Sequence, residues 1–427
     1  MASPTHVRVR SYNVGFGDCF LLTFMYAGEK ERNVLIDFGS TKASRSSPDL
    51  PTIARLIHDH SGGKLDMVVA THRHADHING FGGASGKTIK ALKPDLVVQP
   101  WTEDPKLAPD AQAPAGRAAD APTGSHALVA RLGNMQAVAA AVVAQLPALE
   151  ASPSVRKTVR EQLAFLGETN LANADAVRNL MTMGKKNLYA SFGTELPVDD
   201  LLPGVKIDVL GPPTLEESAK IQTQRSSDPD EFWQLAATRA DPTRADGAPD
   251  VLFPAAAVTG PVPQEARWVI PEIERMRSEE ILAIVRILDS VLNNTSLILL
   301  FEVGETRMLF PGDAQIENWS YALFTAPDCD EIRKRLATAR FYKVGHHGSR
   351  NATPKTLWKG FEHVGPEGGP GRLETMLSTL AGKHGSVARG TEVPRRVLVE
   401  ALKAGSNLHD TEDLRKAHPW ADVDLDL

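Results

Sequence analysis

The feature that most constrains this chain is a cluster of three histidines and one aspartate directly after a short apolar segment. Residues 65–70 (LDMVVA) form a nearly continuous apolar run, which is typical of a β-strand buried on both faces. The chain then continues as THRHADH over residues 71–77. So many polar groups beside a buried strand need binding partners. Imidazole nitrogens and carboxylate oxygens are ligands of zinc and similar divalent ions, so the pattern predicts a metal site.

The rest of the sequence predicts an α/β fold in two β-rich halves. Apolar runs and alternating patterns predict strands at 7–12, 19–26, 33–38, 65–70, 95–100, 206–213, 296–303, 306–310, 341–344 and 374–379. Helices are predicted at 48–60 and around 393–404. We therefore expect a first half at 1–100, a large helical and loop-rich insertion at 101–290, which could cover a binding site, and a second half at 291–427.

Charge and hydropathy exclude several classes of protein. The chain has 47 Lys and Arg against 53 Asp and Glu, and its formal charge of −6 gives no overall basic field for non-specific nucleic-acid binding. The longest apolar run, at 137–144, is far shorter than the ~20 residues of a membrane span. The first ten residues are polar and do not resemble a secretory signal. These patterns predict a cytoplasmic protein with no membrane partner.

Three further motifs accompany the histidine cluster in a fixed order. They are VLIDFGS with Asp37, LFPGDA with Asp313, and VGHHGS with His346 and His347. With HxHxDH they resemble the metallo-β-lactamase-fold hydrolase superfamily. NVGFGDCFLL (13–22) and the segments 293–313 and 344–354 are similar to the hydrolase domain of DNA-uptake competence proteins of the ComEC type. The resemblance covers about 1–100 and 296–415 and leaves 101–290 unassigned.

The resemblance implies an αββα sandwich, in which two mixed sheets pack face to face with helices outside and metal ions at one sheet edge. Two divalent ions are implied, zinc being expected and manganese the alternative. The implied ligands are His72 and His74 for one ion, Asp76, His77 and His346 for the other, and Asp313 between them. Asp37 is expected to support the histidine loop without binding an ion.

The resemblance also suggests which residues act in catalysis. Asp76 and Asp313 hold the ions, while His347 or His384 is a candidate proton donor to the leaving group. Neighbouring residues on an extended segment point to opposite sides, so we assign His346 as the metal ligand and His347 to substrate or proton transfer.

One departure from the family pattern concerns the first metal site. Most members with two ions supply a third histidine where this chain has Asn-Asn-Thr-Ser at 293–296. The competence-type branch is similar at this point. The amide oxygen of Asn294 is a candidate weak ligand that would suit a harder ion such as manganese; the other interpretation is a residue that only shapes the turn.

These observations predict a metal-dependent hydrolase that uses a metal-bound hydroxide on a phosphodiester, with nucleic acid among the candidate substrates. Two alternatives stay open: a hydrolase of a small ester, lactone or amide, and a non-catalytic binding protein whose metal site has decayed. A cleft lined with Arg and Lys favours the first function, a closed apolar pocket favours the second, and absence of bound metal favours the third.

Overall fold

The computed structural model describes residues 3–28, 30–107, 113–114, 174–219, 291–349, 351, 353–369, 371–383 and 392–427. The chain forms two compact units, and all of the described residues belong to the first, which comprises 1–129, 172–224 and 290–427. His384 and most of the predicted insertion lie outside the described residues.

The first sheet has seven strands in the order β13-β1-β2-β3-β4-β5-β6. They are β1 (His6–Tyr12), β2 (Cys19–Tyr26), β3 (Lys30–Phe38), β4 (Met67–Val69), β5 (Leu96–Pro100), β6 (Lys186–Ala190) and β13 (Trp420–Asp426). The strands from β13 to β3 pair antiparallel, whereas those from β3 to β6 pair parallel. Alternation decides which face of β1 is buried: Val7 and Val9 face the core, while Arg8 donates to Asp424 on β13.

The second sheet has six strands in the order β12-β11-β10-β9-β8-β7. They are β7 (Lys206–Gly211), β8 (Ile298–Val303), β9 (Thr306–Phe310), β10 (Ala339–Lys343), β11 (Glu374–Leu377) and β12 (Asn407–Asp410). Strands β7, β8 and β9 pair antiparallel, and β9 through β12 pair parallel. Both sheets are therefore mixed, and each has a run of parallel strands whose carboxyl ends meet at one edge.

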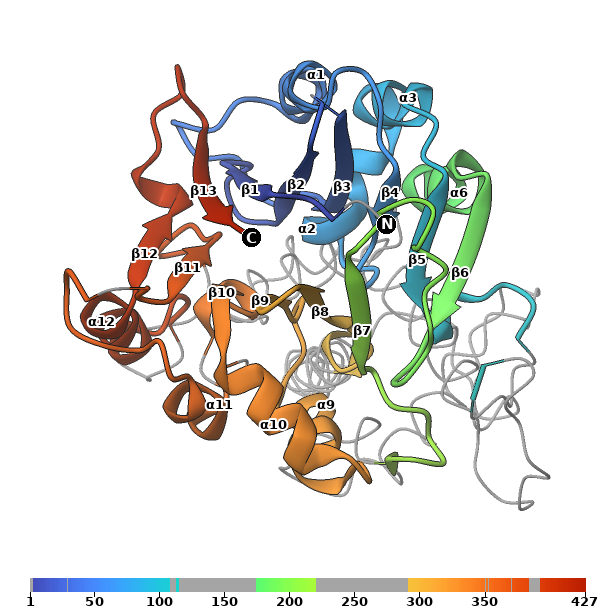
Figure 1. Cartoon of the computed structure of the whole chain (residues 1–427). Coiled ribbons are helices and arrows are strands. Elements are labelled where there is room, and N and C mark those ends of the chain that lie inside the picture. Colours follow the sequence, from blue (N-terminus) through green and yellow to red (C-terminus); the bar gives the residue numbers. More distant parts are fainter. Residues whose placement is uncertain are drawn as a thin grey trace, which may run out of the picture. The chain divides into compact units, whose positions relative to one another are not determined.

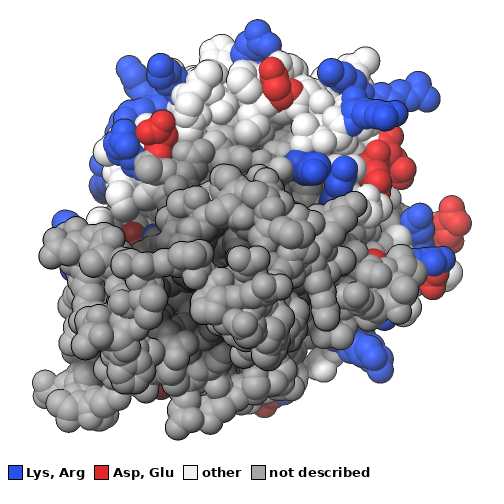
Figure 2. Space-filling view, turned by 180° about the vertical axis from the view of Figure 1, so that it is seen from behind, with Lys and Arg blue, Asp and Glu red and all other residues white. Residues whose placement is uncertain are grey.

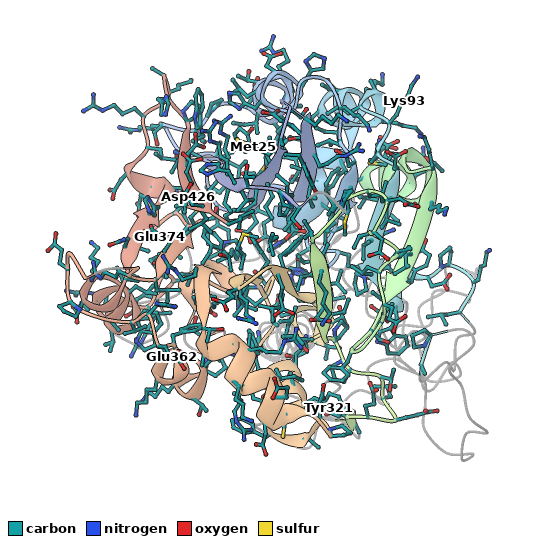
Figure 3. All side chains as sticks on the ribbon, viewed as in Figure 1. Met25, Lys93, Tyr321, Glu362, Glu374 and Asp426 are labelled. Carbon is teal, nitrogen blue, oxygen red and sulfur yellow. The ribbon has the colours of Figure 1, made fainter. Side chains whose placement is uncertain are left out.

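One apolar core lies between the two sheets, and side chains fill the space there (Figure 3). Phe20 and Phe24 of β2 contact Phe310 and Phe301 of the second sheet, with ring centroids 6.1 and 6.3 Å apart. Burial of such large rings is a main source of stability in a two-sheet core. These ring contacts pack the two sheets against each other.

Helices cover the outer face of each sheet, as Figure 1 shows. The first sheet carries α1 (Leu50–His60), α3 (Gly83–Ala91) and α6 (Ala174–Met183), and the second carries α9 (Ile316–Ser320), α10 (Cys329–Ala337), α11 (Lys355–Gly360) and α12 (Arg396–Gly405). Short helical turns are α2 (Ala75–Ile78), η1 (Asn79–Phe81), η2 (Trp101–Glu103), η6 (Tyr321–Thr325), η7 (His346–Gly348) and η9 (Thr411–Asp413). Helix α1 begins where Asp49 accepts a hydrogen bond from the Thr52 backbone amide.

The predicted α/β class is confirmed, and every strand predicted from the sequence is present, although several are shorter. The predicted insertion at 101–290 is too wide, because α6, β6 and β7 fall inside it and belong to the two sheets. Strand β13 closes the first sheet beside β1 and was not predicted. Among the described residues, no helix is both long and apolar enough to cross a bilayer.

Candidate metal centre

The predicted site residues lie at the carboxyl ends of parallel strands from both sheets. Asp37 stands at the end of β3, and the histidine cluster follows β4. Asp313 follows β9, and the VGHHGS turn follows β10. Gly39 lets the chain leaving β3 press against α2, because a Cβ there would lie 2.5 Å from backbone atoms of Ala75 and His77. The topology therefore brings segments far apart in the sequence to one edge.

Asp37 organises the histidine cluster through hydrogen bonds to Thr71 and His77. Its Oδ1 accepts the Thr71 backbone N–H at 2.7 Å, and its Oδ2 accepts the Thr71 hydroxyl at 2.7 Å and His77 Nδ1–H at 2.7 Å. Its backbone is left-handed, with φ 56°, a conformation that aspartate tolerates better than most residues. The hydrogen bond fixes the His77 tautomer and leaves Nε2 for a ligand, as in many metal-bound histidines.

His72 is held in the same way through Thr71. Its Nδ1 lies 3.2 Å from the Thr71 hydroxyl oxygen, which itself donates to Asp37. We therefore assign the proton to Nδ1, which leaves Nε2 of His72 unprotonated and able to accept. That atom lies 2.9 Å from His74 Nδ1, so the two imidazoles of the HxH pair meet at their ring nitrogens. Both side chains are at most 2% exposed.

His347 completes a second group of donors with Asp76. Its Nδ1–H donates to the Ser378 carbonyl at 2.9 Å, while its Nε2 lies 3.1 Å from Asp76 Oδ2. Asp313 faces both groups, since its Oδ2 lies 3.1 Å from His77 Nε2 and 3.6 Å from His347 Nε2. Candidate ligand atoms within 4.8 Å of one another form the sets His72, His77 and Asp313; Asp76, His77 and His347; and Asp18, Asp37 and His77.

The backbone at His346 and His347 differs from the extended segment predicted from the sequence. The segment is not extended but forms the turn η7, in which His346 has φ 43° and His347 has φ 50°. His347 is 1% exposed and lies among the carboxylates, whereas the His346 side chain is 23% exposed and its Nε2 lies 3.9 Å from Asp313 Oδ2. The turn therefore buries the second histidine rather than the first.

The Asn-Asn-Thr-Ser segment at 293–296 is buried, and Asn293 lies beside His346. The amide nitrogen of Asn293 lies 3.5 Å from His346 Nε2. The Asn293 Oδ1 atom and both amide atoms of Asn294 make no hydrogen bond. Asn294 thus has a buried oxygen of the kind the sequence suggested as a weak ligand. His384, the other predicted proton donor, lies outside the described residues.

Two charged residues in the centre were not predicted from the sequence. Asp18 is fully buried, and Lys343, at the end of β10, is 3% exposed. The Lys343 ammonium forms an ion pair with Asp18, lies 3.5 Å from Asp313 Oδ1 and donates to the Gly312 carbonyl at 3.1 Å. A lysine in an otherwise apolar strand, FYKV, was the available signal, because a buried ammonium needs an acidic partner.

Burial and the neighbouring charged groups shift the pKa values of the histidines and aspartates in the centre. Burial lowers the pKa of His77, but Asp313, Asp37 and Asp18 outweigh burial and raise it well above the ordinary value. Burial raises the pKa of Asp76, yet the hydrogen bond from His347 and the charge of His77 lower it to about 2. For His72, burial and the neighbouring imidazoles lower the pKa well below the ordinary value. Asp76 is therefore ionised near neutral pH.

Some buried carboxylate oxygens in the centre accept no hydrogen bond, namely Asp18 Oδ1, Asp76 Oδ1 and Asp313 Oδ1. Buried polar atoms without hydrogen bonds are costly and rare in folded proteins, so a cluster of them needs an explanation. Imidazole nitrogen and carboxylate oxygen converging on one place form a donor set that suits zinc or manganese. The residues present therefore fit a divalent ion.

Comparison of the chain with protein-family models gives no match, and neither does comparison with curated proteins. The functional interpretation of the centre therefore depends on its own residues.

Proposed function

We propose that this protein is a metal-dependent hydrolase of the metallo-β-lactamase fold, with phosphodiesters as substrates. One observation carries the proposal. His72, His77 and His347 each have Nδ1 hydrogen-bonded to an oxygen, which turns Nε2 toward another buried candidate ligand. The Nε2 atom of His72 lies 2.9 Å from His74 Nδ1, that of His77 lies 3.1 Å from Asp313 Oδ2, and that of His347 lies 3.1 Å from Asp76 Oδ2. That is how metal-binding histidines are prepared in proteins.

In this proposal two divalent ions are held by side chains from both sheets, zinc being expected and manganese the alternative. The HxH pair serves one ion, Asp76, His77 and His347 serve the other, and Asp313 reaches both. His347 takes the ligand role first given to His346, because His347 is the buried member of the pair. Bound ions of this kind lower the pKa of water toward neutrality and stabilise the attacking and leaving oxygens of a displacement.

The remaining histidine of the turn then has the role of proton donor. The Nδ1 atom of His346 forms a 2.8 Å hydrogen bond with the Ser349 hydroxyl, and the His346 side chain is partly exposed. An imidazole at the rim of the centre can reach a leaving group while the buried one cannot. We assign proton transfer to His346 and leave His384 as the second candidate from the sequence.

Phosphodiesters are favoured on two grounds. Centres with two ions and a shared carboxylate suit in-line displacement at phosphorus. The segments at 13–22, 293–313 and 344–354 also resemble a domain that acts in DNA uptake. On the face drawn in Figure 2, the described residues include both basic and acidic side chains, which favours neither DNA nor a smaller diester.

The test is elemental analysis of the purified protein followed by a substrate screen. The screen uses bis(p-nitrophenyl) phosphate, p-nitrophenyl acetate and single-stranded DNA, each with added Zn²⁺ or Mn²⁺. His77→Ala should abolish metal binding and turnover, while His58→Ala, an exposed histidine on α1, should change neither. Protein without metal and without activity on any substrate would reject the proposal, and activity on the acetate alone would support the ester alternative.

A further inference from the structure

The described part of the chain contains a buried lysine that the proposed function does not use. Lys343 ends β10, three residues before the histidine turn, and is 3% exposed. Lysine is rarely buried to this extent, because removing an ammonium from water is costly unless acidic partners surround it. Its position within the centre therefore calls for a role.

The partners of Lys343 belong to the metal centre itself. Its ammonium forms an ion pair with Asp18 and lies 3.5 Å from Asp313 Oδ1. Asp18 in turn lies 3.7 Å from Nδ1 of both His77 and His347. The Asp18 backbone also ties the centre together, since its N–H donates to the Asp76 carbonyl at 2.9 Å and its carbonyl accepts the Gly39 N–H at 3.0 Å. Lys343 thus contacts Asp313, which is a proposed metal ligand, and Asp18, which lies beside the proposed ligands His77 and His347.

The centre contains more buried carboxylates than lysine or arginine side chains paired with them, among the described residues. Four carboxylates, those of Asp18, Asp37, Asp76 and Asp313, are buried together at the strand ends. Among the described residues, Lys343 is the lysine or arginine that forms ion pairs with them. Like charges at this distance repel strongly in a buried site. A permanent cation beside Asp18 and Asp313 reduces that repulsion before any divalent ion binds, and then opposes the ion once it is bound.

We propose that Lys343 is a positioning residue that supplies a fixed positive charge to the centre. It holds Asp18 and Asp313 in place in the absence of divalent ions and lowers the affinity of the centre for them. This inference rests on the proposed metal function. A consequence is that the ions at this centre exchange more readily than four buried carboxylates alone would allow.

The test is a charge cycle read by metal binding rather than by activity. Lys343→Met removes the ammonium and keeps most of the side-chain volume, Asp18→Asn removes the opposing charge, and the double variant removes both. Affinities for Zn²⁺ and Mn²⁺ are measured separately at pH ~8 by competition with a chelating dye. Lys334→Met, which removes an exposed ammonium on α10, is the matched control.

We expect Lys343→Met to bind the ions at least ~10-fold more tightly than the natural chain, because one opposing charge is gone. Asp18→Asn should bind them more weakly, and the double variant should return close to the natural affinity. A lysine that only packed the strand would give weaker binding in Lys343→Met and no recovery in the double variant. Equal or weaker binding by Lys343→Met overturns the inference.

Thermal unfolding gives a second readout for a variant that folds poorly. Without metal, Lys343→Met should unfold at a lower temperature than the natural chain, because Asp18 is buried without its cation. Saturating Mn²⁺ should raise the midpoint of Lys343→Met more than that of the natural chain. A variant that stays unfolded with saturating metal overturns the inference. Absence of metal binding by the natural chain instead rejects the proposed function itself.

Discussion

His77 Nε2 lies 3.1 Å from Asp313 Oδ2, and this contact joins the two sheets at the metal centre. His77 belongs to α2, which follows β4 in the first sheet, whereas Asp313 follows β9 in the second. The same Asp313 oxygen lies 3.6 Å from His347 Nε2, which follows β10. One carboxylate thus faces histidines from both halves of the chain, and its removal should affect the centre as a unit.

Asp313→Ala should lower turnover by more than ~1000-fold, because one carboxylate serves both proposed ions. Elemental analysis of the variant should also show a loss of bound metal. Asp330→Ala, which removes an exposed aspartate from α10, is the control and should change neither quantity. Near-normal rates and metal content in Asp313→Ala would contradict the bridging role.

The two histidines of the turn η7 should behave differently. His347→Ala should lose metal, because its Nε2 lies among buried carboxylates. His346→Ala should keep most of its metal and lose turnover, most severely with substrates whose leaving groups need a proton. Metal content is compared in both variants, and rates are compared for an activated and an unactivated diester. Metal loss in His346→Ala with retention in His347→Ala would restore the assignment first made from the sequence.

Much of the fold could be predicted from the sequence because its strands carry strong local signals. The run LDMVVA and the alternation in β1 and β2 depend only on which face each residue buries. The boundary of the insertion could not be predicted in this way. Strand β6 (KNLYA) is short, and its burial depends on pairing with β5, which no local pattern encodes.

The candidate site was predicted in part, since its motifs are dense in metal-binding side chains. Asp37, His72, Asp76, His77 and Asp313 converge as the motifs suggested. The exchange between His346 and His347 could not be foreseen, because it depends on two consecutive left-handed residues. Lys343 was missed for another reason: its partner Asp18 is distant in sequence and directly precedes β2 of the first sheet, so only the packing of the two sheets brings them together.

Asp37→Asn should weaken metal binding by ~10- to 100-fold without unfolding the protein. The change removes the charge that orients His77 and Thr71, and losses of this size follow removal of such supporting groups. Asparagine tolerates the left-handed backbone at this position, so the loop should keep its path. Metal affinity and a circular dichroism spectrum check both points. Unchanged affinity would show that Asp37 does not orient His77.

The free energy of unfolding in the presence of a chelator should fall as the pH rises above ~6.5, the ordinary pKa of histidine. The pKa values of His77 and His347 are raised in the folded protein, chiefly by Asp313 acting against burial. A raised histidine pKa stabilises the fold below ~6.5 and loses that contribution as pH rises through the folded value, by up to ~1.4 kcal/mol per pH unit for each group. Urea unfolding at several pH values tests this. The decline should be smaller in His347→Gln.

Added Zn²⁺ should reverse this pH dependence. A divalent ion competes with the protons on His77 and His347, so metal binding should release protons and strengthen as pH rises. Calorimetric titration in buffers of different ionisation enthalpy measures the protons released. Binding without proton release would mean that the ion does not use these two nitrogens.

Asp410→Asn should stabilise the protein above pH ~6 and have little effect near pH ~4. Burial and the neighbouring Asp413 and Glu412 raise the pKa of Asp410 to about 6. Because an unfolded aspartate titrates near ~3.9, the folded protein loses stability as pH rises from ~4 to ~6 and does not regain it at higher pH.

Asparagine removes this penalty, and it can still accept the hydrogen bond that Asp410 receives from the Glu412 backbone amide at 2.9 Å. The expected gain at pH ~7.5 is about 1–3 kcal/mol, measured by urea unfolding. Asp199→Asn, at an exposed turn, should give no such difference between the two pH values. The gain in the free energy of unfolding should appear only where the Asp410 carboxyl is ionised. Equal effects of Asp410→Asn at both pH values would mean that the pKa of Asp410 is not raised in the folded protein.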